Sequence, residues 1–289
     1  MESTQFNLNN GTRIPAIGLG ASIVPKGNGK IAGNEPATRQ WHMYQYMAVN
    51  HRDVVYDISP SYGLSEYILG NVIEHVGHRE NMYIALKISN YEQRGGDVKK
   101  AFENHLARLH TDYVDLLMLH WPHPGTFVQS WLALEEIYAS GRAKALGVSN
   151  CHEHHFAELM ERAKVLPAVN QIEVHPLFTQ EPLRAYCAGK GIHIMAYTPL
   201  GRMHDVLMKN KVLRQIAARR HKTVPQIILR WDVDSGMTTI PRTLTPAHFE
   251  EDLDIFSFAL TPEEIKAIDG VNENVRLRFN PDTVDYNMV

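Results

Sequence analysis

Four side chains able to exchange protons stand at regular intervals in the first half of the chain. Asp57, Lys87 and His120 each end a short apolar segment, and Tyr62 lies five residues after Asp57. The segment ends are 30 residues (57 to 87) and 33 residues (87 to 120) apart, about the size of one strand–helix–strand unit. Parallel α/β folds gather catalytic groups at the C-terminal ends of their strands. The spacing therefore predicts that the four side chains meet at one site.

Together these residue types suit general acid catalysis. A phenol such as that of Tyr62 is a poor acid at neutral pH, because its ordinary pKa is about 10. A neighbouring ammonium, here Lys87, favours the phenolate and is expected to lower that pKa, while Asp57 keeps the lysine charged. His120 is then free to hydrogen-bond a substrate oxygen. The set predicts protonation of a carbonyl that receives a hydride, and side chains cannot supply the hydride, so a nicotinamide cofactor is expected.

The elements that must position these residues alternate regularly between strand and helix. Apolar runs of this length are typical of buried strands, and Pro60 stops the first one. An Asn-Gly turn at 10–11 predicts an N-terminal hairpin. Barrel strands are expected at 17–20, 54–57, 81–87, 113–120, 143–148, 168–174, 191–197 and 237–240, and helices at 38–50, 65–74, 97–109, 127–139, 153–163, 181–188, 212–220, 224–232, 246–252 and 262–268.

Eight strand–helix units without a linker predict a (β/α)8 TIM barrel, with the hairpin before it and extra helices near the C-terminus. One domain is expected over 1–289. The alternative is an open, doubly wound parallel sheet. Gly18-Leu19-Gly20 counts against it, because the phosphate-binding turn of that fold needs a third glycine.

Composition narrows the class of protein further. The chain has 289 residues and a net charge of −3, which gives no general attraction to nucleic acid or anionic membrane. Its two cysteines favour a reducing compartment, and no apolar run approaches the length of a membrane span. We therefore expect a cytoplasmic protein, monomeric or weakly dimeric, whose partner is a small molecule.

Seven segments resemble the signatures of the aldo-keto reductases, in particular of the smaller bacterial-type members that use NADPH. They occur in the family's order over nearly the whole chain. The segments are DISPSYG (57–63), the lysine at 87, YVDLLMLHWP (113–122), GVSN (147–150), NQIEVHP (170–176), AYTPLG (196–201) and IPRT (240–243).

The resemblance implies reduction of aldehydes or ketones by NADPH, with NADH as a weaker alternative, and a cofactor extended across the barrel mouth. Tyr62 would be the acid, Asp57 and Lys87 would tune it, and His120 would orient the substrate. The residues implied for the cofactor are Ser149, Asn150 and Gln171 at the carboxamide, Tyr197 stacked on the nicotinamide, Thr198, Pro199 and Leu200 at the pyrophosphate, and Arg242, Thr243, His248, Glu251 and Asp252 at the adenosine end with its 2′-phosphate.

Departures from the family pattern affect both ends of the expected ligand site. Ala21 and Ser22 stand where the family usually has a threonine and an aromatic residue, so a substrate-pocket wall is missing. Ser22 and Trp121 are the expected substrate contacts. The tail after residue 268 is short and polar, which predicts a reduced C-terminal loop.

At the adenosine end, Arg242 replaces the usual lysine and keeps its charge. His248 replaces an arginine and Asp252 replaces an asparagine, so the strength of the NADPH preference is open.

Two other classes of function compete with the reductase hypothesis. A barrel could bind the nucleotide as a sensor or accessory subunit with little turnover, but a sensor need not keep the acid. A metal-dependent hydrolase would need inward histidine and carboxylate pairs on early strands, and the first strand has none. The segment 151–155 contains three histidines without the H-E-x-x-H spacing, so a solvated helix start is predicted there and no metal site.

Overall fold

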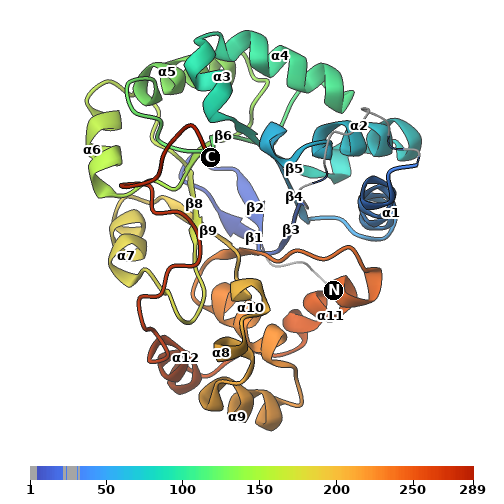
Figure 1. Ribbon diagram of the computed structural model, residues 1–289, viewed down its shortest axis with the longest axis vertical. Coiled ribbons are helices and arrows are strands. Elements are labelled where there is room, and N and C mark those ends of the chain that lie inside the picture. Colours follow the sequence, from blue (N-terminus) through green and yellow to red (C-terminus); the bar gives the residue numbers. More distant parts are fainter. Residues whose placement is uncertain (1–4, 22–23, 25–30, 32) are drawn as a thin grey trace.

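The structure is a computed structural model that describes residues 5–21, 24, 31 and 33–289 (Figure 1). Eight parallel strands follow one another in chain order around a barrel. They are β3 (Gly18–Gly20), β4 (Val55–Ile58), β5 (Tyr83–Ile88), β6 (Leu116–Leu119), β7 (Leu146–Ser149), β8 (Val169–Glu173), β9 (His193–Tyr197) and β10 (Thr238–Ile240). A parallel bridge between Ile17 and Thr239 joins the first strand to the last. The predicted (β/α)8 barrel is confirmed, and the open sheet is excluded.

Helices surround this barrel as the sequence predicts (Figure 1). They are α1 (Glu35–Asn50), α2 (Ser65–Val76), α3 (Asn90–Gly95), α4 (Val98–Leu109), α5 (Phe127–Ala139), α6 (Glu153–Met160), α7 (Glu181–Gly189), α8 (Asp205–Met208), α9 (Lys211–Arg220), α10 (Val224–Asp234), α11 (Pro246–Leu253) and α12 (Pro262–Asp269). The short α3 and α8 were not expected. Both are too short for an apolar period to show, although the capping box of Ser89 and Glu92 at the start of α3 is a local signal.

The N-terminal hairpin closes one end of the barrel. Strands β1 (Gln5–Asn7) and β2 (Arg13–Pro15) pair antiparallel, as expected. Gly11 takes a φ of 83° in the turn, which an L-residue rarely adopts. Leu8 and Ile14 pack against the apolar side chains that fill the barrel interior.

The barrel interior fixes which residues reach the other end. Val55, Ala85 and Met118 are buried together inside the barrel. Alternate residues of a strand share a face, so the residues two positions later point to the same side. These are Asp57, Lys87 and His120. The strands therefore deliver the three side chains to the C-terminal mouth, as the spacing predicts.

The C-terminal segment after α12 runs back over this mouth (Figure 1). The carboxylate of Glu173, at the end of β8, accepts the backbone N–H groups of Leu277 at 2.7 Å and Arg278 at 3.1 Å. The side chain of Asn90 donates to the carbonyl of Val289 at 2.7 Å. The tail thus reaches across the barrel rim; a reduced C-terminal loop stays a prediction. Among the described residues, no helix has the length and apolar character needed to cross a membrane.

Candidate active site

A buried ion pair lies at the centre of the barrel mouth. The ammonium of Lys87, which is fully buried, pairs with the carboxylate of Asp57, which is 4% exposed. The amide of Gln171 donates to the same carboxylate oxygen at 2.8 Å. A buried charge is tolerated only when it is paired and hydrogen-bonded. Lys87 therefore has one defined position, with its ammonium 5.0 Å from the centre of the Tyr62 ring.

Tyr62 is held beside this pair by a tight turn. It ends a single turn of 3₁₀-helix over Pro60–Tyr62, which Ser59 caps by accepting the N–H of Ser61 at 3.2 Å. Gly63 follows with a φ of 71°, and a Cβ there would lie 1.7 Å from the carbonyl oxygen of Val24. Only glycine fits this position. The chain can therefore turn sharply after Tyr62 and leave its phenol at the mouth.

His120 faces Tyr62 from the end of β6. Its Nε2 lies 3.5 Å from the Tyr62 hydroxyl, longer than a good hydrogen bond. Its Nδ1 lies 3.2 Å from the Ser59 hydroxyl, whose oxygen already accepts the Ser61 N–H. The Ser59 hydroxyl is thus free to donate to Nδ1, which leaves a proton on Nε2. In this tautomer His120 presents an N–H to the mouth.

The electrostatics of the three groups suit a proton donor at neutral pH. Burial, reinforced by Asp57, raises the pKa of Tyr62 well above its usual value, although Arg278 opposes the shift. Burial lowers the pKa of Lys87, against the effect of Asp57. Burial and Lys87 together hold the pKa of His120 well below its usual value. The expected lowering of the Tyr62 pKa by Lys87 is not seen; burial of the phenol and the charge of Asp57 raise it instead. Tyr62 is protonated and His120 is neutral.

Four of the residues implied for a nicotinamide form one connected group. The hydroxyl of Ser149 donates to the Gln171 carbonyl at 2.9 Å. The Asn150 amide donates to the His120 carbonyl at 3.0 Å, and its oxygen accepts the Tyr197 hydroxyl at 2.7 Å. Asn150 has a φ of 62°, so the chain bends sharply at the end of β7. Thr198, also at positive φ, begins the turn with Pro199 and Leu200 that follows Tyr197.

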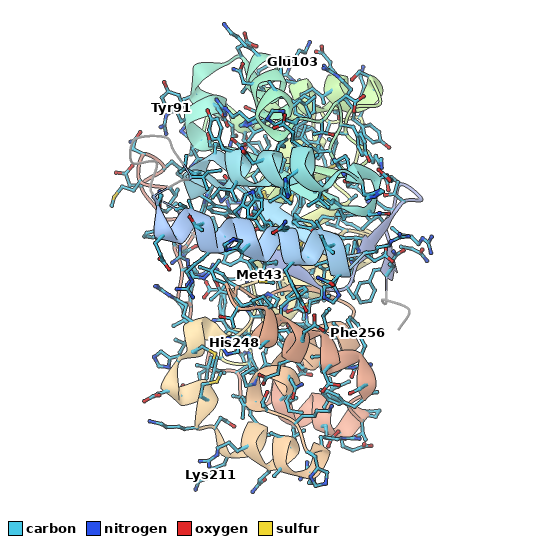
Figure 2. The ribbon with its side chains drawn as sticks, turned by 90° about the vertical axis from the view of Figure 1, so that its right-hand side faces the viewer. Met43, Tyr91, Glu103, Lys211, His248 and Phe256 are labelled. Atoms are coloured by element: carbon cyan, nitrogen blue, oxygen red, sulfur yellow. The ribbon has the colours of Figure 1, made fainter. Side chains whose placement is uncertain are left out.

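The residues implied for the adenosine end lie just before α11 and within it. Arg242 is exposed and forms no ion pair within the described part of the chain. The Thr243 hydroxyl accepts the Thr245 N–H at 3.1 Å, and His248 is exposed in the first turn of α11, on the face shown in Figure 2. An unpaired guanidinium, a hydroxyl and an imidazole near a helix N-terminus are donors that fit a phosphate.

The two acidic residues of this end differ from each other. Glu251 accepts the Thr223 hydroxyl at 2.8 Å. Asp252 is 7% exposed, and no hydrogen bond to its carboxyl is seen from the described residues. The donor set as a whole fits an adenosine phosphate, whereas Asp252 is a buried acid without a hydrogen-bond partner among the described residues.

Comparison with known proteins identifies the family. The model of the Aldo/keto reductase family matches residues 16–273. The chain belongs to the aldo/keto reductase family. It is 38% identical over 275 residues to glyoxal reductase of Bacillus subtilis (strain 168), an alignment that covers 95% of each chain.

Solved structures of family members have the same fold. The aldo-keto reductase AKR2E4 of Bombyx mori, in complex with NADP, has a TM-score of 0.83 at 29% identity and covers 98% of this chain and 97% of its own. A mutant of Gox0644 in complex with NADPH has a TM-score of 0.86 at 28% identity, covering 99% of this chain and 100% of its own. Both matches extend over almost the entire barrel.

The aromatic side chains at the rim of the barrel mouth are only partly foreseen by the sequence. Trp121 is 7% exposed, and the ring of Tyr286, from the C-terminal tail, stands edge-on to it at 6.4 Å. Ser22 lies outside the described residues. Tyr286, and Glu173 through its bonds to the tail, are site residues that sequence reasoning missed. Glu173 belongs to the segment 170–176, so that motif was the available signal, whereas the tail carries no motif pointing to Trp121.

One cluster outside the mouth has metal-binding residue types. His154, His155 and Asp282 have ligand atoms within 4.8 Å of one another. However, Nδ1 of His155 accepts the His152 N–H at 3.0 Å, which leaves the proton on Nε2 and blocks that atom as a ligand. Nδ1 of His152 lies 2.9 Å from Asp282, so the cluster also fastens the tail to α6. That the chain binds no metal stays a prediction.

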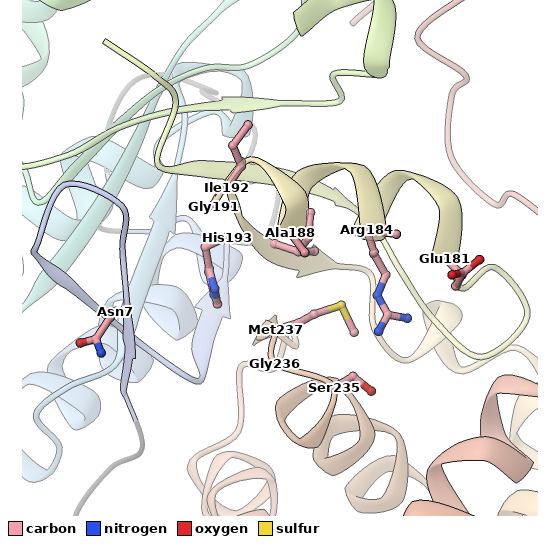
Figure 3. Close-up of a pocket in the computed structure, with 12 residues that line it drawn as sticks. Asn7, Glu181, Arg184, Ala188, Gly191, Ile192, His193, Ser235, Gly236 and Met237 are labelled. Atoms are coloured by element: carbon pink, nitrogen blue, oxygen red, sulfur yellow. The ribbon is translucent and has the colours of Figure 1, made fainter.

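A separate cavity of about 470 Å³ lies at the opposite end of the barrel. Residues from α7, the segments before β9 and β10, and the hairpin residue Asn7 line it (Figure 3). None of the residues assigned above to catalysis or cofactor binding lines it.

Proposed function

We propose that this chain is an NADPH-dependent reductase of aldehyde or ketone carbonyls, of EC 1.1.1 type, formed by one domain over 1–289 and acting in the cytoplasm. The observation that carries the proposal is the buried pair of Lys87 and Asp57 beside the protonated phenol of Tyr62. A cation buried next to a phenol stabilises the phenolate left after proton transfer. A protein that only binds a nucleotide does not need this arrangement.

When bound, a nicotinamide cofactor would supply the hydride that the carbonyl carbon receives. The protein supplies the proton, which passes from the Tyr62 hydroxyl to the carbonyl oxygen. Lys87 stabilises the phenolate that remains, and Asp57 keeps Lys87 charged despite its burial. The Nε2–H of His120 donates to the same carbonyl oxygen and so fixes its position. Trp121 and Tyr286 form an aromatic wall beside that oxygen.

The cofactor would be held by the groups that the site leaves available. Ser149, Asn150 and Gln171 offer amide and hydroxyl groups to the carboxamide, and the Tyr197 ring offers a stacking face. Thr198, Pro199 and Leu200 border the pyrophosphate. Arg242, which forms no ion pair with a described residue, accounts together with Thr243 and His248 for the choice of NADPH over NADH, because a guanidinium binds a phosphate through two parallel hydrogen bonds.

Loss of the NADPH absorbance band during incubation with aldehydes, ketones and sugars tests this function. Wild type should oxidise NADPH only when a carbonyl compound is present. Tyr62→Phe should lose most of this activity. Tyr83→Phe is the matched control for that variant, because the Tyr83 hydroxyl is also buried but has no partner in the described structure. Tight NADPH binding without turnover of any carbonyl would favour the alternative, a nucleotide-binding sensor or accessory subunit.

A further inference from the structure

A buried histidine that the mechanism does not use lies between two glutamates. His105 of α4 is fully buried. Its Nδ1 is 2.5 Å from a carboxylate oxygen of Glu66 in α2, and its Nε2 is 3.0 Å from one of Glu92 in α3. Neither imidazole nitrogen has the alignment of a hydrogen bond, so attraction between opposite charges carries both contacts. One imidazolium ring therefore joins three helices.

The two glutamates sit directly behind catalytic residues. Glu66 is the second residue of α2, which starts three positions after Tyr62. Ser89 lies two positions after Lys87. Glu92, three residues further on, accepts the N–H and the hydroxyl of Ser89, each at 2.8 Å. His105 thus holds the chain just beyond the acid and just beyond the lysine that supports it.

The helices at this point cannot slide to compensate for a lost contact. A Cβ on Gly70 of α2 would lie 2.0 Å from the backbone carbonyl of Arg108 in α4, so the two helices already touch through their backbones. In Figure 2, Tyr91 and Glu103 mark α3 and α4 at one end of the molecule. α3 packs on α4 as well, and its Glu92 contacts His105 from the side opposite Glu66.

The charge state of His105 follows from its surroundings. Burial alone would lower the pKa of His105, but the contacts with Glu66 and Glu92 outweigh it and raise the pKa to about 9. Arg108 is the other charged group at this point, 3.2 Å from Glu66. The imidazolium is therefore retained at neutral pH and is lost only in alkaline solution.

We propose that His105, as an imidazolium, is a positioning residue that sets the relative placement of Tyr62 and Lys87 by tying together the segments that follow them. Its effect on turnover rests on the proposed carbonyl reduction, whereas its effect on the two segments does not. His105 contacts neither substrate nor any residue assigned to the cofactor.

Amide hydrogen exchange measured by mass spectrometry tests the placement without any turnover. His105→Gln should speed exchange in peptides covering 59–66 and 88–95. The variant is expected to fold, because Glu66 keeps Arg108 and Glu92 keeps Ser89. Glu92→Gln, which leaves the pair with Glu66 intact, should affect only 88–95. His193→Gln is the matched control, a largely buried histidine bonded to Thr238 at 2.9 Å at the far end of β9. Unchanged exchange in both segments of His105→Gln, or equal change in His193→Gln, overturns the proposal.

A pH series separates positioning from simple stabilisation. The imidazole resonance that disappears in His105→Gln should titrate near pH 9 in wild type. Wild-type kcat for carbonyl reduction should fall as pH rises through that midpoint, while KM for NADPH stays constant. His105→Gln should have a kcat lower by up to about 100-fold at neutral pH, as expected for a misplaced catalytic group, and no step near this pH. Titration of His105 near neutral pH, or the same alkaline step in His105→Gln, contradicts the proposal.

Discussion

The two ends of the proposed ligand site are built in opposite ways. At the catalytic end the buried charges are paired with each other, because Asp57 holds Lys87 inside the barrel and also accepts a hydrogen bond from Gln171. At the adenosine end Arg242 and His248 are exposed, and no described residue forms an ion pair with either. Asp252 is the only acid of that end that is both buried and without a hydrogen bond from the described chain.

This difference has a physical origin. Preorganised groups lower a reaction barrier because they need no rearrangement during the reaction. A recognition site, by contrast, keeps its donors free, so that a ligand and not the protein satisfies them. Substitutions at the catalytic end should therefore change turnover and stability, and substitutions at the adenosine end should change cofactor affinity.

The largest effect is expected from Tyr62→Phe, which deletes the proton donor and keeps the ring. General acid catalysis contributes on the order of 10²- to 10⁴-fold, so kcat should fall by about that factor. The dissociation constant of NADPH, measured by quenching of protein fluorescence, should stay the same. A variant that kept more than half of wild-type kcat, with chemistry rate-limiting, would show that another group is the acid.

Removing the lysine should be the most destabilising change. Lys87→Met leaves the Asp57 carboxylate buried without a counter-charge, and loss of one partner of a buried pair costs about 3–5 kcal/mol of the free energy of unfolding. Urea unfolding measures this loss. The double variant Asp57→Asn with Lys87→Met should recover part of it, because no charge stays unpaired. If the double variant loses as much unfolding free energy as the two single variants together, Asp57 and Lys87 are not energetically coupled.

The sequence predicts the catalytic end better than the adenosine end or the rim. Asp57, Lys87 and His120 could be placed because strand periodicity fixes the face of each residue, and the barrel then forces the strand ends together. The distances between these side chains and the raised pKa of Tyr62 could not be derived from the sequence, because both depend on how the surrounding residues pack.

Contacts between distant segments were not foreseen. Tyr286 meets Trp121 across 165 residues of chain (121 to 286), and Glu66 meets His105 across 39 (66 to 105), without any periodic pattern that joins them. Short elements such as α3 and α8 were missed for a related reason, since tertiary contacts and caps rather than apolar repeats define them.

At the adenosine end, Arg242→Gln should weaken NADPH binding without changing stability. A hydrogen bond to a charged group contributes about 1.5–3 kcal/mol, so the dissociation constant of NADPH should rise roughly 10- to 100-fold. NADH lacks the 2′-phosphate and serves as the internal control. His248→Arg should act in the opposite sense and strengthen the NADPH preference, because a guanidinium binds a phosphate through two parallel hydrogen bonds. An equal loss of NADH affinity in Arg242→Gln would place the arginine elsewhere on the nucleotide.

A gain in stability is expected from neutralising Asp252, the buried acid of the adenosine end. Burial, with a contribution from Glu251, raises the pKa of Asp252 to about 7, whereas a carboxyl of an unfolded chain titrates near 4. Between these values the folded state binds more protons than the unfolded state, so this residue makes stability fall as pH rises from about 4 to 7. Asp252→Asn removes this pH-dependent contribution to the free energy of unfolding. In urea unfolding, this variant should be as stable as wild type in acid and more stable above neutral pH. Asp57→Asn, which removes the partner of Lys87, should by contrast be less stable than wild type at neutral pH. The exposed Asp205 provides the control, since Asp205→Asn should give no gain at any pH. Loss of stability in Asp252→Asn at alkaline pH would mean that its carboxylate has a partner and that the two ends of the site are alike.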